Sequence, residues 1–499
     1  MKRRSLRMHH LAMLALPALL AACAVGPDYK RPDAPMAAAW KTDPGWQVAQ
    51  PRDGELKGEW WKIFNDADLD ALQTRALTDS QTLQSAAARL EQARAQARVA
   101  GSALFPTVGV QAGATRDRIS ADRPVTNYSI VNQSTVQNDF TAGFSVSYEA
   151  DLFGGVRRSI ESANATAAQA QADFENVRLV LTAEIAGDYF SLRENDTEID
   201  LLEKILVAQT GGLKYIKDRY DLGAASALDL RQQEALTAAT QSQLIQLRDQ
   251  RARYEHALAT LIGVPAPSFS LPRNVNLAAV PNIPLTAPSA LLERRPDIAS
   301  AERAMAAANA QIGVAKSAWF PSVPLTAGYG RESNEWSTLF SAPAAVWAFG
   351  VSATQTLFDG GRRSAGVILA EAGYRQSVAD YRQSVLSAMQ EVQDGLSSTT
   401  ALAQAVESSQ QAATAADAAL QLANDSYTLG AATHLVVLQA EQSQLTYQRE
   451  LVQLRGQQLL NAVKLVKALG GGWYVDAPVN DMKPAQKEAE GVNNENIAR

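Results

Sequence analysis

The stretch Tyr220-Asp221-Leu222-Gly223-Ala224-Ala225-Ser226 occurs again, nearly unchanged, as Tyr427-Thr428-Leu429-Gly430-Ala431-Ala432-Thr433. A second glycine follows each stretch at the same spacing, Gly263 after Gly223 and Gly470 after Gly430. Self-similarity at a nearly fixed offset predicts one architecture used twice, so we expect an internal duplication of roughly 200 residues. Two upstream pairs extend the match: Leu152-Phe153-Gly154-Gly155 with Leu357-Phe358-Asp359-Gly360-Gly361, and Phe105-Pro106 with Phe320-Pro321.

The composition argues against several classes of protein. The 499 residues include 46 Lys plus Arg and 52 Asp plus Glu, so no basic excess points to nucleic acid. The chain has no P-loop, dinucleotide fingerprint or hydrolase motif, and we expect neither enzyme activity nor a bound cofactor. His256 and His434 each stand alone, so no metal site is predicted, and His434 is expected to be a surface residue beside a helix cap.

The amino terminus predicts export and lipidation. Residues 1–22 combine four basic residues with an apolar run too short to span a membrane permanently, which is typical of a secretory signal. Cys23 is the only cysteine, so an internal disulfide is excluded. The run Leu20-Ala21-Ala22-Cys23 resembles the bacterial lipoprotein cleavage box, which implies a covalent lipid on Cys23. Ala24 follows in place of Asp, and the same resemblance implies the outer membrane.

Hydrophobic periodicity predicts the same elements in both copies. An extended arm covers residues 23–66, a Pro-rich linker covers 264–288 and a polar tail covers 473–499. The first copy, 67–263, is expected to hold a helix at 66–101, strands near 108–112 and 140–149 around a polar segment at 116–138, and helices at 155–222 and 226–262. The second copy, 289–472, is expected to hold a helix at 296–318, strands near 323–329 and 347–351, and helices ending near 429 and 469.

The long helix of the first copy carries a coiled-coil pattern. Gly211 and Gly212 interrupt it, but Ala418 and Ala419 match them in the second copy, so we expect the helix to continue. Ser226, with Asp229 three residues on, predicts a capping box at the next helix. The apolar positions at heptad spacing are Leu192, Ile199, Leu202, Leu206, Leu213, Ile216 and Tyr220.

Element lengths indicate an α+β architecture with a membrane part. A helix of about 66 residues is about 100 Å long, which no compact globule accommodates. Four strands of about ten residues match the length of a tilted membrane-crossing strand, but four cannot close a barrel around a lumen. Open strand edges are not tolerated in lipid, so if these strands enter a membrane, other copies of the chain must complete the barrel. Two, three or four copies would give 8, 12 or 16 strands; the alternative is a soluble coiled-coil lipoprotein whose strands pack on its own helices.

Three further segments are distinctive in their order and spacing: Val25-Gly26-Pro27-Asp28-Tyr29-Lys30-Arg31-Pro32, Leu291-Leu292-Glu293-Arg294-Arg295-Pro296-Asp297-Ile298 and Ala468-Leu469-Gly470-Gly471-Gly472-Trp473. Together they resemble the outer-membrane factors of tripartite efflux pumps, the TolC and OprM type. The resemblance implies a homotrimer in which a 12-stranded outer-membrane β-barrel continues as a long α-helical coiled-coil barrel through the periplasm. It also implies passive export of drugs or other small molecules, together with a periplasmic adaptor protein and an inner-membrane transporter of the resistance-nodulation-division class. Alternatives are the duct of a type I protein secretion system and a structural lipoprotein without a pore.

The same resemblance implies roles for both repeated turns. They would be the periplasmic tips that meet the adaptor, with Tyr220, Gly223, Ser226, Tyr427, Gly430 and Thr433 as their marker residues. Family members often carry a ring of Asp just past the second tip, and the matching position here is Gln439, flanked by Leu435 and Gln442. Three Gln side chains would form a neutral constriction, so we expect weaker binding of divalent cations there than in Asp-bearing relatives.

Overall fold

The computed structural model describes residues 24–37, 39–41, 58–122, 134–281, 283 and 295–471. It divides into two compact units, and each contains parts of both repeats. The sheet unit is drawn from Met1–Pro35, Gln81–Arg178 and Asp297–Ser387. The hairpin unit is drawn from Met36–Ser80, Leu179–Pro296 and Ala388–Arg499.

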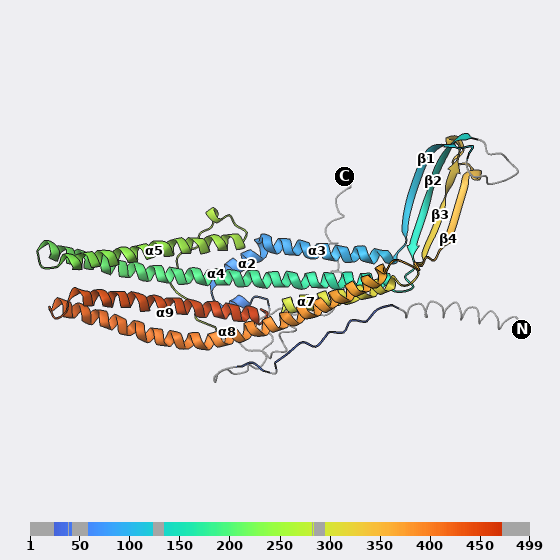
Figure 1. The fold of residues 1–499 in the computed structure, drawn as a ribbon. Helices are drawn as coiled ribbons and strands as arrows, with labels where there is room; N and C mark the ends of the chain where they lie inside the picture. Colours follow the sequence, from blue (N-terminus) through green and yellow to red (C-terminus); the bar gives the residue numbers. More distant parts are fainter. Residues whose placement is uncertain are drawn as a thin grey trace, which may run out of the picture. The chain divides into compact units, whose positions relative to one another are not determined.

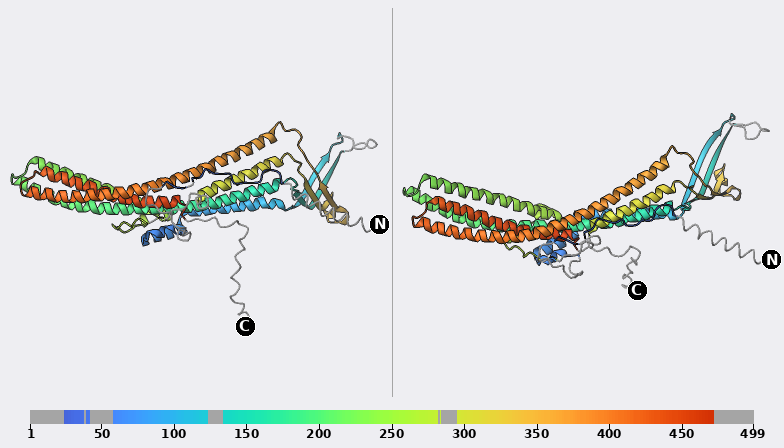
Figure 2. Two further views of the ribbon diagram at one scale, coloured as in Figure 1. Left: turned by 90° about the horizontal axis from the view of Figure 1, so that it is seen from below. Right: turned by 60° about the horizontal axis from the view of Figure 1, so that its bottom comes forward.

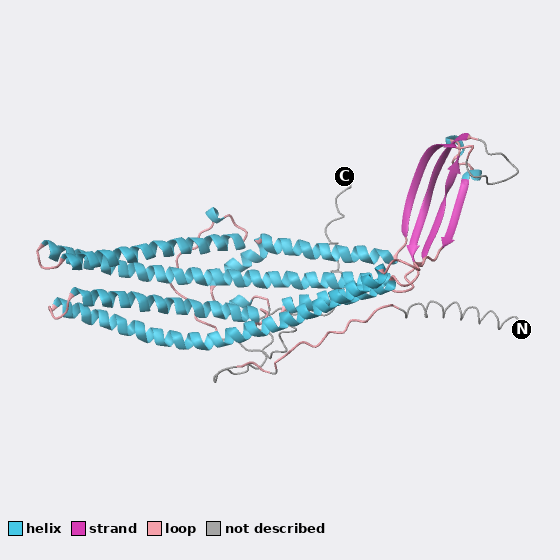
Figure 3. Cartoon of the chain, viewed as in Figure 1, coloured by secondary structure: helices cyan, strands magenta, loops and turns pink. Residues whose placement is uncertain are grey.

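One antiparallel sheet holds four strands in sequence order (Figures 1 and 3). They are β1 (Thr107–Ile119), β2 (Thr135–Glu149), β3 (Pro324–Ser333) and β4 (Ala345–Val351). β1 and β4 pair on one side only, so each leaves one edge open within the chain. The predicted polar segment at 116–138 was partly wrong: Ile119 pairs with Thr135, because ladder hydrogen bonds continue past the apolar part of the hairpin.

The two faces of the sheet differ in chemistry. Val110, Phe144, Tyr329 and Trp347 lie opposite one another across all four strands, and each is at least half exposed. The neighbouring row on this face holds Val108, Val146, Ala327 and Phe349. Cross-strand partners share a face, so these rows make the face largely apolar, and no described residues form a layer over it. The rows of the other face carry small or polar residues, among them Gly109, Ser145, Gly328, Thr107, Ser147, Thr326 and Gly350.

The repeated Leu-Phe-Gly-Gly motif starts a helix in each copy. Asp151 accepts hydrogen bonds from the backbone N–H groups of Val156 and Arg157 at the start of α4 (Gly155–Asp221). Asp359 does the same for Gly361 and Arg363 at the start of α8 (Arg362–Thr428). In both copies the aspartate satisfies backbone donors that a helix start leaves open, and it also pairs with an arginine of the first turn.

The segment Val25–Pro32 is bound along the helices of the sheet unit. Arg158 of α4 donates to the carbonyls of Val25 and Gly26 and pairs with Asp28 at 2.8 Å. Asn309, in α7 (Pro296–Ser317), donates to the carbonyl of Pro27 at 2.9 Å. Gly26 has a φ of +111°, and a Cβ there would clash with the backbone of α7. Side chains on two helices therefore donate hydrogen bonds to the backbone carbonyls of an arm that has no regular secondary structure.

Two antiparallel helix pairs form the hairpin unit (Figures 1 and 2). The carboxyl-terminal part of α4 pairs with α5 (Ala227–Leu261), and that of α8 pairs with α9 (His434–Ala468). The heptad pattern packs the core, and α4 continues through Gly211 and Gly212 as expected. Tyr220, the last predicted heptad position, is exposed. The buried cluster between the pairs contains Ile199, Leu202, Ile205, Leu244, Leu247 and Leu445.

The predicted helix at 66–101 is wrong in one respect, because it is two helices. α2 (Ala67–Asp79) and α3 (Gln81–Gly101) are separated by Ser80, which is extended at φ −62° and ψ 121°. The carbonyl of Asp79, at the end of α2, packs directly against Gly263. Gly263 itself has a φ of +73°, which only glycine adopts without strain. A tertiary contact therefore sets this break, and helical periodicity carries no signal for it.

We expect Gly263→Ala to destabilise the protein far more than Gly223→Ala. Both glycines have a φ near +75°, so either alanine costs about 1–2 kcal/mol in backbone strain. A Cβ at Gly223 meets nothing within 4 Å, whereas one at Gly263 overlaps the Asp79 carbonyl, and such overpacking costs about 1–3 kcal/mol more. Thermal unfolding followed by circular dichroism compares the two variants directly. Equal shifts of their midpoints would contradict the structure.

A buried ion network holds the segment after α5 against α4. Asp196 is fully buried and accepts from Arg251 at 2.6 Å, Arg193 at 3.1 Å and the backbone N–H of Asn274 at 3.1 Å. Arg193, with 2% of its surface exposed, also donates to the carbonyl of Pro272 at 2.7 Å. The network fixes the linker between the two repeats to the helices of the first.

Candidate functional site

The two repeated turns close the helix pairs in the same way. The N–H of Gly223 donates to the carbonyl of Tyr220 at 2.9 Å, and that of Ala224 donates to the carbonyl of Arg219 at 2.7 Å. The second turn repeats this with Gly430 to Tyr427 and Ala431 to Ser426, at 3.0 and 2.8 Å. This is the Schellman arrangement, and it requires the positive φ that both glycines have.

The turns differ in how the next helix begins. Ser226 and Asp229 form the predicted capping box, with the Ser226 hydroxyl accepting from the Asp229 N–H at 3.1 Å. Thr433 occupies the matching position but makes no side-chain cap. At the apex of each turn a leucine precedes the glycine, and Leu222 and Leu429 are each 84% exposed. Each turn therefore presents one exposed apolar side chain next to its glycine.

An arginine and a tyrosine connect the two turns. The Arg219 guanidinium lies over the ring of Tyr427, 5.4 Å from its centroid, and over the ring of Tyr215 on its own helix. Burial raises the pKa of Tyr427, so the phenol stays neutral and its ring attracts the cation. Tyr220, its counterpart in the first copy, is exposed instead. The equivalence of the two tyrosines in sequence does not extend to their contacts.

Leu435, Gln439 and Gln442 lie on one exposed face of α9. Their spacing of four and three residues places them on the same side of the helix. All three are exposed, while Val437, Leu438 and Leu445 on the other side are buried. Within the chain, this face is therefore available for a contact with another molecule.

The expectation that His434 is a surface residue is wrong. Only 5% of it is exposed, because it packs between Tyr427 of α8 and Gln233 of α5. The repeat itself holds the signal that could have identified it, since the matching residue of the first copy is Ala227. A histidine where the duplicate has alanine marks a contact that only one copy makes.

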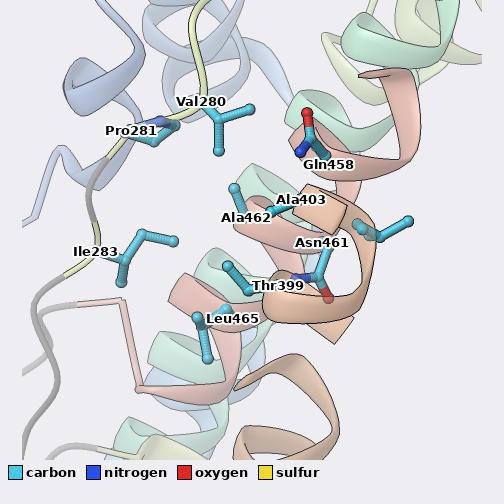
Figure 4. A pocket seen from close by; sticks show the side chains of 10 residues that line it. Val280, Pro281, Ile283, Thr399, Ala403, Gln458, Asn461, Ala462 and Leu465 are labelled. Carbon is cyan, nitrogen blue, oxygen red and sulfur yellow. Dashed lines mark hydrogen bonds between the residues drawn. The ribbon is translucent and has the colours of Figure 1, made fainter. Parts of the chain in front are cut away.

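One apolar cavity lies beside the linker but shows no binding chemistry. It measures about 280 Å³ and separates Pro281 and Ile283 from α8 and α9 (Figure 4). Among its polar lining residues, Asn461 already donates to the Gly395 carbonyl and the Thr399 hydroxyl. Within the described residues, no His, Cys, Asp and Glu side chains gather as metal ligands. Cys23, the predicted lipid-bearing residue, lies outside the described residues.

Comparisons with known proteins agree with the resemblance seen in the sequence. The model of the family described as "Outer membrane efflux protein" matches residues 72–264 and 287–471, one match in each repeat. The toluene efflux pump outer membrane protein TtgF of Pseudomonas putida is 33% identical over 482 residues, which cover 94% of this chain and 98% of that protein. Outer membrane protein OprJ of Pseudomonas aeruginosa is 32% identical over 469 residues, covering 93% and 96%.

The fold agrees with a solved structure of this kind. The outer-membrane channel OprN superposes with a TM-score of 0.82 at 31% identity, covering 90% of this chain and 100% of that one. The four-stranded sheet, the long helices and the duplication are therefore those of a TolC-like fold. None of the described helices has a stretch apolar enough to cross a membrane.

Proposed function

Because the chain belongs to the outer membrane efflux protein family, we propose that three copies assemble into the exit duct of a tripartite efflux pump. The sheets of three copies would form a 12-stranded barrel in the outer membrane. The helices would continue the duct through the periplasm. The duct itself is passive, so a transporter in the inner membrane must supply the energy.

The main support for this proposal is the four-stranded sheet, because of its apolar face and its open edges. No part of the chain that the structure describes covers its apolar face, and exposed aromatic residues such as Phe144, Trp347 and Phe349 are costly in water. Its two open edges are intolerable in lipid unless another chain pairs with them. Joining β4 of one copy to β1 of the next pairs both edges, and the lipid then covers the apolar face. The small and polar residues of the other face then line the lumen.

The proposed partner at the turns is the periplasmic adaptor. Leu222 and Leu429 offer the same apolar contact from both hairpins, beside the tip residues Gly223, Ser226, Gly430 and Thr433. A helical hairpin of an adaptor that packs against these turns would bury both leucines and approach the glycine backbone closely. Leu435, Gln439 and Gln442 would face the axis just past the second turn and form the periplasmic gate.

We propose that Cys23 carries a lipid, and the position of its neighbour Ala24 indicates where this lipid would lie. The Cα of Ala24 lies 2.8 Å from where a Cβ of Gly154 would be, just after the end of β2. A lipid attached one residue earlier would therefore leave the chain at the base of the sheet, where the outer membrane would begin. The mass of the mature chain tests this, because acylation adds several hundred daltons to a chain that starts at Cys23.

The proposed cargo is small molecules, with a resistance-nodulation-division transporter as the pump. Relatives that match nearly the whole chain are named as toluene and antibiotic efflux pump proteins. A duct for protein secretion is the competing function, and the inner-membrane partner recovered through the adaptor distinguishes the two.

The decisive experiment is reconstitution of the full-length, acylated protein. Native mass spectrometry is expected to give a trimer, and planar bilayers are expected to show conductance once the periplasmic end is opened. A stable monomer without conductance under every opening condition would contradict the proposal. It would instead favour a coiled-coil lipoprotein without a pore.

A further inference from the structure

One buried polar contact joins the two helix pairs beside the second turn. Nε2 of His434, on α9, lies 3.1 Å from Oε1 of Gln233, on α5. Gln233 is fully buried, and the Tyr427 ring of α8 packs 5.4 Å from the imidazole. Side chains from three helices therefore meet around one buried hydrogen bond. We call it the His434–Gln233 contact.

The hydrogen bonds of Gln233 indicate which nitrogen of the His434 ring carries the proton. Nε2 of Gln233 donates to Glu441 at 3.4 Å, so Oε1 of Gln233 faces the histidine and must accept its hydrogen bond. His434 is then the tautomer with its proton on Nε2. Its Nδ1 is buried and has no hydrogen-bond partner among the described residues. A second proton on Nδ1 would therefore carry a charge into a site that offers it no acceptor.

We propose that His434 makes this junction of the hairpins pH-sensitive, holding them together when neutral and loosening them when protonated. The consequence for transport rests on the proposed channel function, because the tips would have to part for the duct to open. The ligand that this site senses is the proton.

The charges around the ring determine the direction of the effect. Burial lowers the pKa of His434, and the Asp229 carboxylate of α5 opposes this more weakly. Once the hairpins part, the ring regains its ordinary pKa of about 6.5, so parting takes up a proton. Below about pH 6.5 acid therefore favours the parted state, by up to about tenfold per pH unit for one proton, until the lowered pKa is reached.

Three other titratable side chains lie near the His434–Gln233 contact. Burial raises the pKa of Glu441, so this carboxyl takes up its proton in the packed state and works in the opposite direction to His434. Arg219 of α4 keeps its charge, and Tyr427 of α8 stays neutral, throughout this range. The contribution of His434 to the pH dependence is therefore measured as the difference between the wild type and a variant that lacks this histidine.

His434→Gln and His256→Gln form a matched pair for the test. Glutamine at 434 keeps an N–H for Gln233 but does not titrate, and His256 is the other histidine of the mature chain, exposed on α5. The test measures hydrogen exchange of the backbone amides in segment 427–434 of the full-length protein between pH 7.5 and 5.5. The observed rates are corrected for the intrinsic pH dependence of amide exchange. We expect wild type and His256→Gln to lose protection together on acidification, while His434→Gln loses none. Identical profiles for all three would overturn the proposal.

Two further measurements separate the pH-sensitive contact from the effects of the substitutions and from the channel function. Exchange at the imidazole Cε1 of wild type reports the pKa of His434 without any substitution, and a value at or above 6.5 would also overturn the proposal. Opening frequency in bilayers is expected to follow the exchange profile in each variant. A protein that never conducts but still loses protection through His434 would refute the duct while supporting the pH-sensitive contact.

Discussion

Replacing Asp196 by alanine is expected to lower the free energy of unfolding by about 3–5 kcal/mol. Asp196 is fully buried and accepts hydrogen bonds from two arginines, Arg193 and Arg251. Without it, the buried Arg193 guanidinium loses a partner at 3.1 Å and is left with Asp68, 2.8 Å away, as its remaining ion-pair partner. Removing the carboxylate from this buried network costs more than losing an exposed pair, because Arg193 stays buried while it loses part of the compensation for its charge.

The same substitution is expected to release the linker. Asp196 accepts from the backbone N–H of Asn274, and Arg251 donates to the carbonyl of Leu271 at 2.7 Å. Both contacts depend on the carboxylate, directly or through the arginine that it orients. Trypsin cleavage after Arg273 should therefore become faster in Asp196→Ala, and this reports local release separately from global stability.

Asp200→Ala provides the matched control, one turn further along α4. Asp200 pairs with Lys204 at 2.7 Å, but the lysine side chain is 75% exposed. An exposed pair of this kind contributes about 0–1 kcal/mol. Thermal unfolding should thus separate the two alanine variants clearly. If they unfold together, the buried network does not contribute to stability as its geometry implies.

Much of the fold could be predicted from the sequence because its long elements have strong periods. Heptad positions such as Leu192, Ile199 and Leu202 are fully or almost fully buried in the structure. The alternation of Phe140, Phe144 and Tyr148 lies within β2, as expected. The duplication is matched by two copies of the family model. Such patterns succeed because they sum many weak preferences over long segments.

The features that escaped prediction are all set by tertiary contacts. Ser80 breaks a helix because Asp79 must meet Gly263, far away in sequence. The ends of β1 and β2 are polar but stay paired, since the ladder needs only backbone groups. His434 is buried by residues from two other helices. The periodicity of one helix contains no information about these partners.

At the proposed gate, Gln439→Asp is expected to make the channel current sensitive to block by divalent cations, whereas the wild-type channel is expected to be insensitive to this block. Gln439 is exposed on the same face of α9 as Leu435 and Gln442. In the proposed trimer this face surrounds the axis, so one substitution places three carboxylates around it. Planar-bilayer recordings with added magnesium or calcium on the periplasmic side measure the block.

Coulomb's law indicates why the effect should be large. At about 5 Å in water each carboxylate attracts a divalent cation by roughly 1.7 kcal/mol before screening, so three change the affinity by well over tenfold even when salt removes half. Gln439→Asn is the neutral control, since it has the shape of aspartate without the charge, and it should stay insensitive. Strong block of the wild type would show that other groups bind the cation. Equal behaviour of the Asp and Asn variants would mean that Gln439 does not face the axis, because three new charges around a narrow pore cannot leave a divalent ion unaffected.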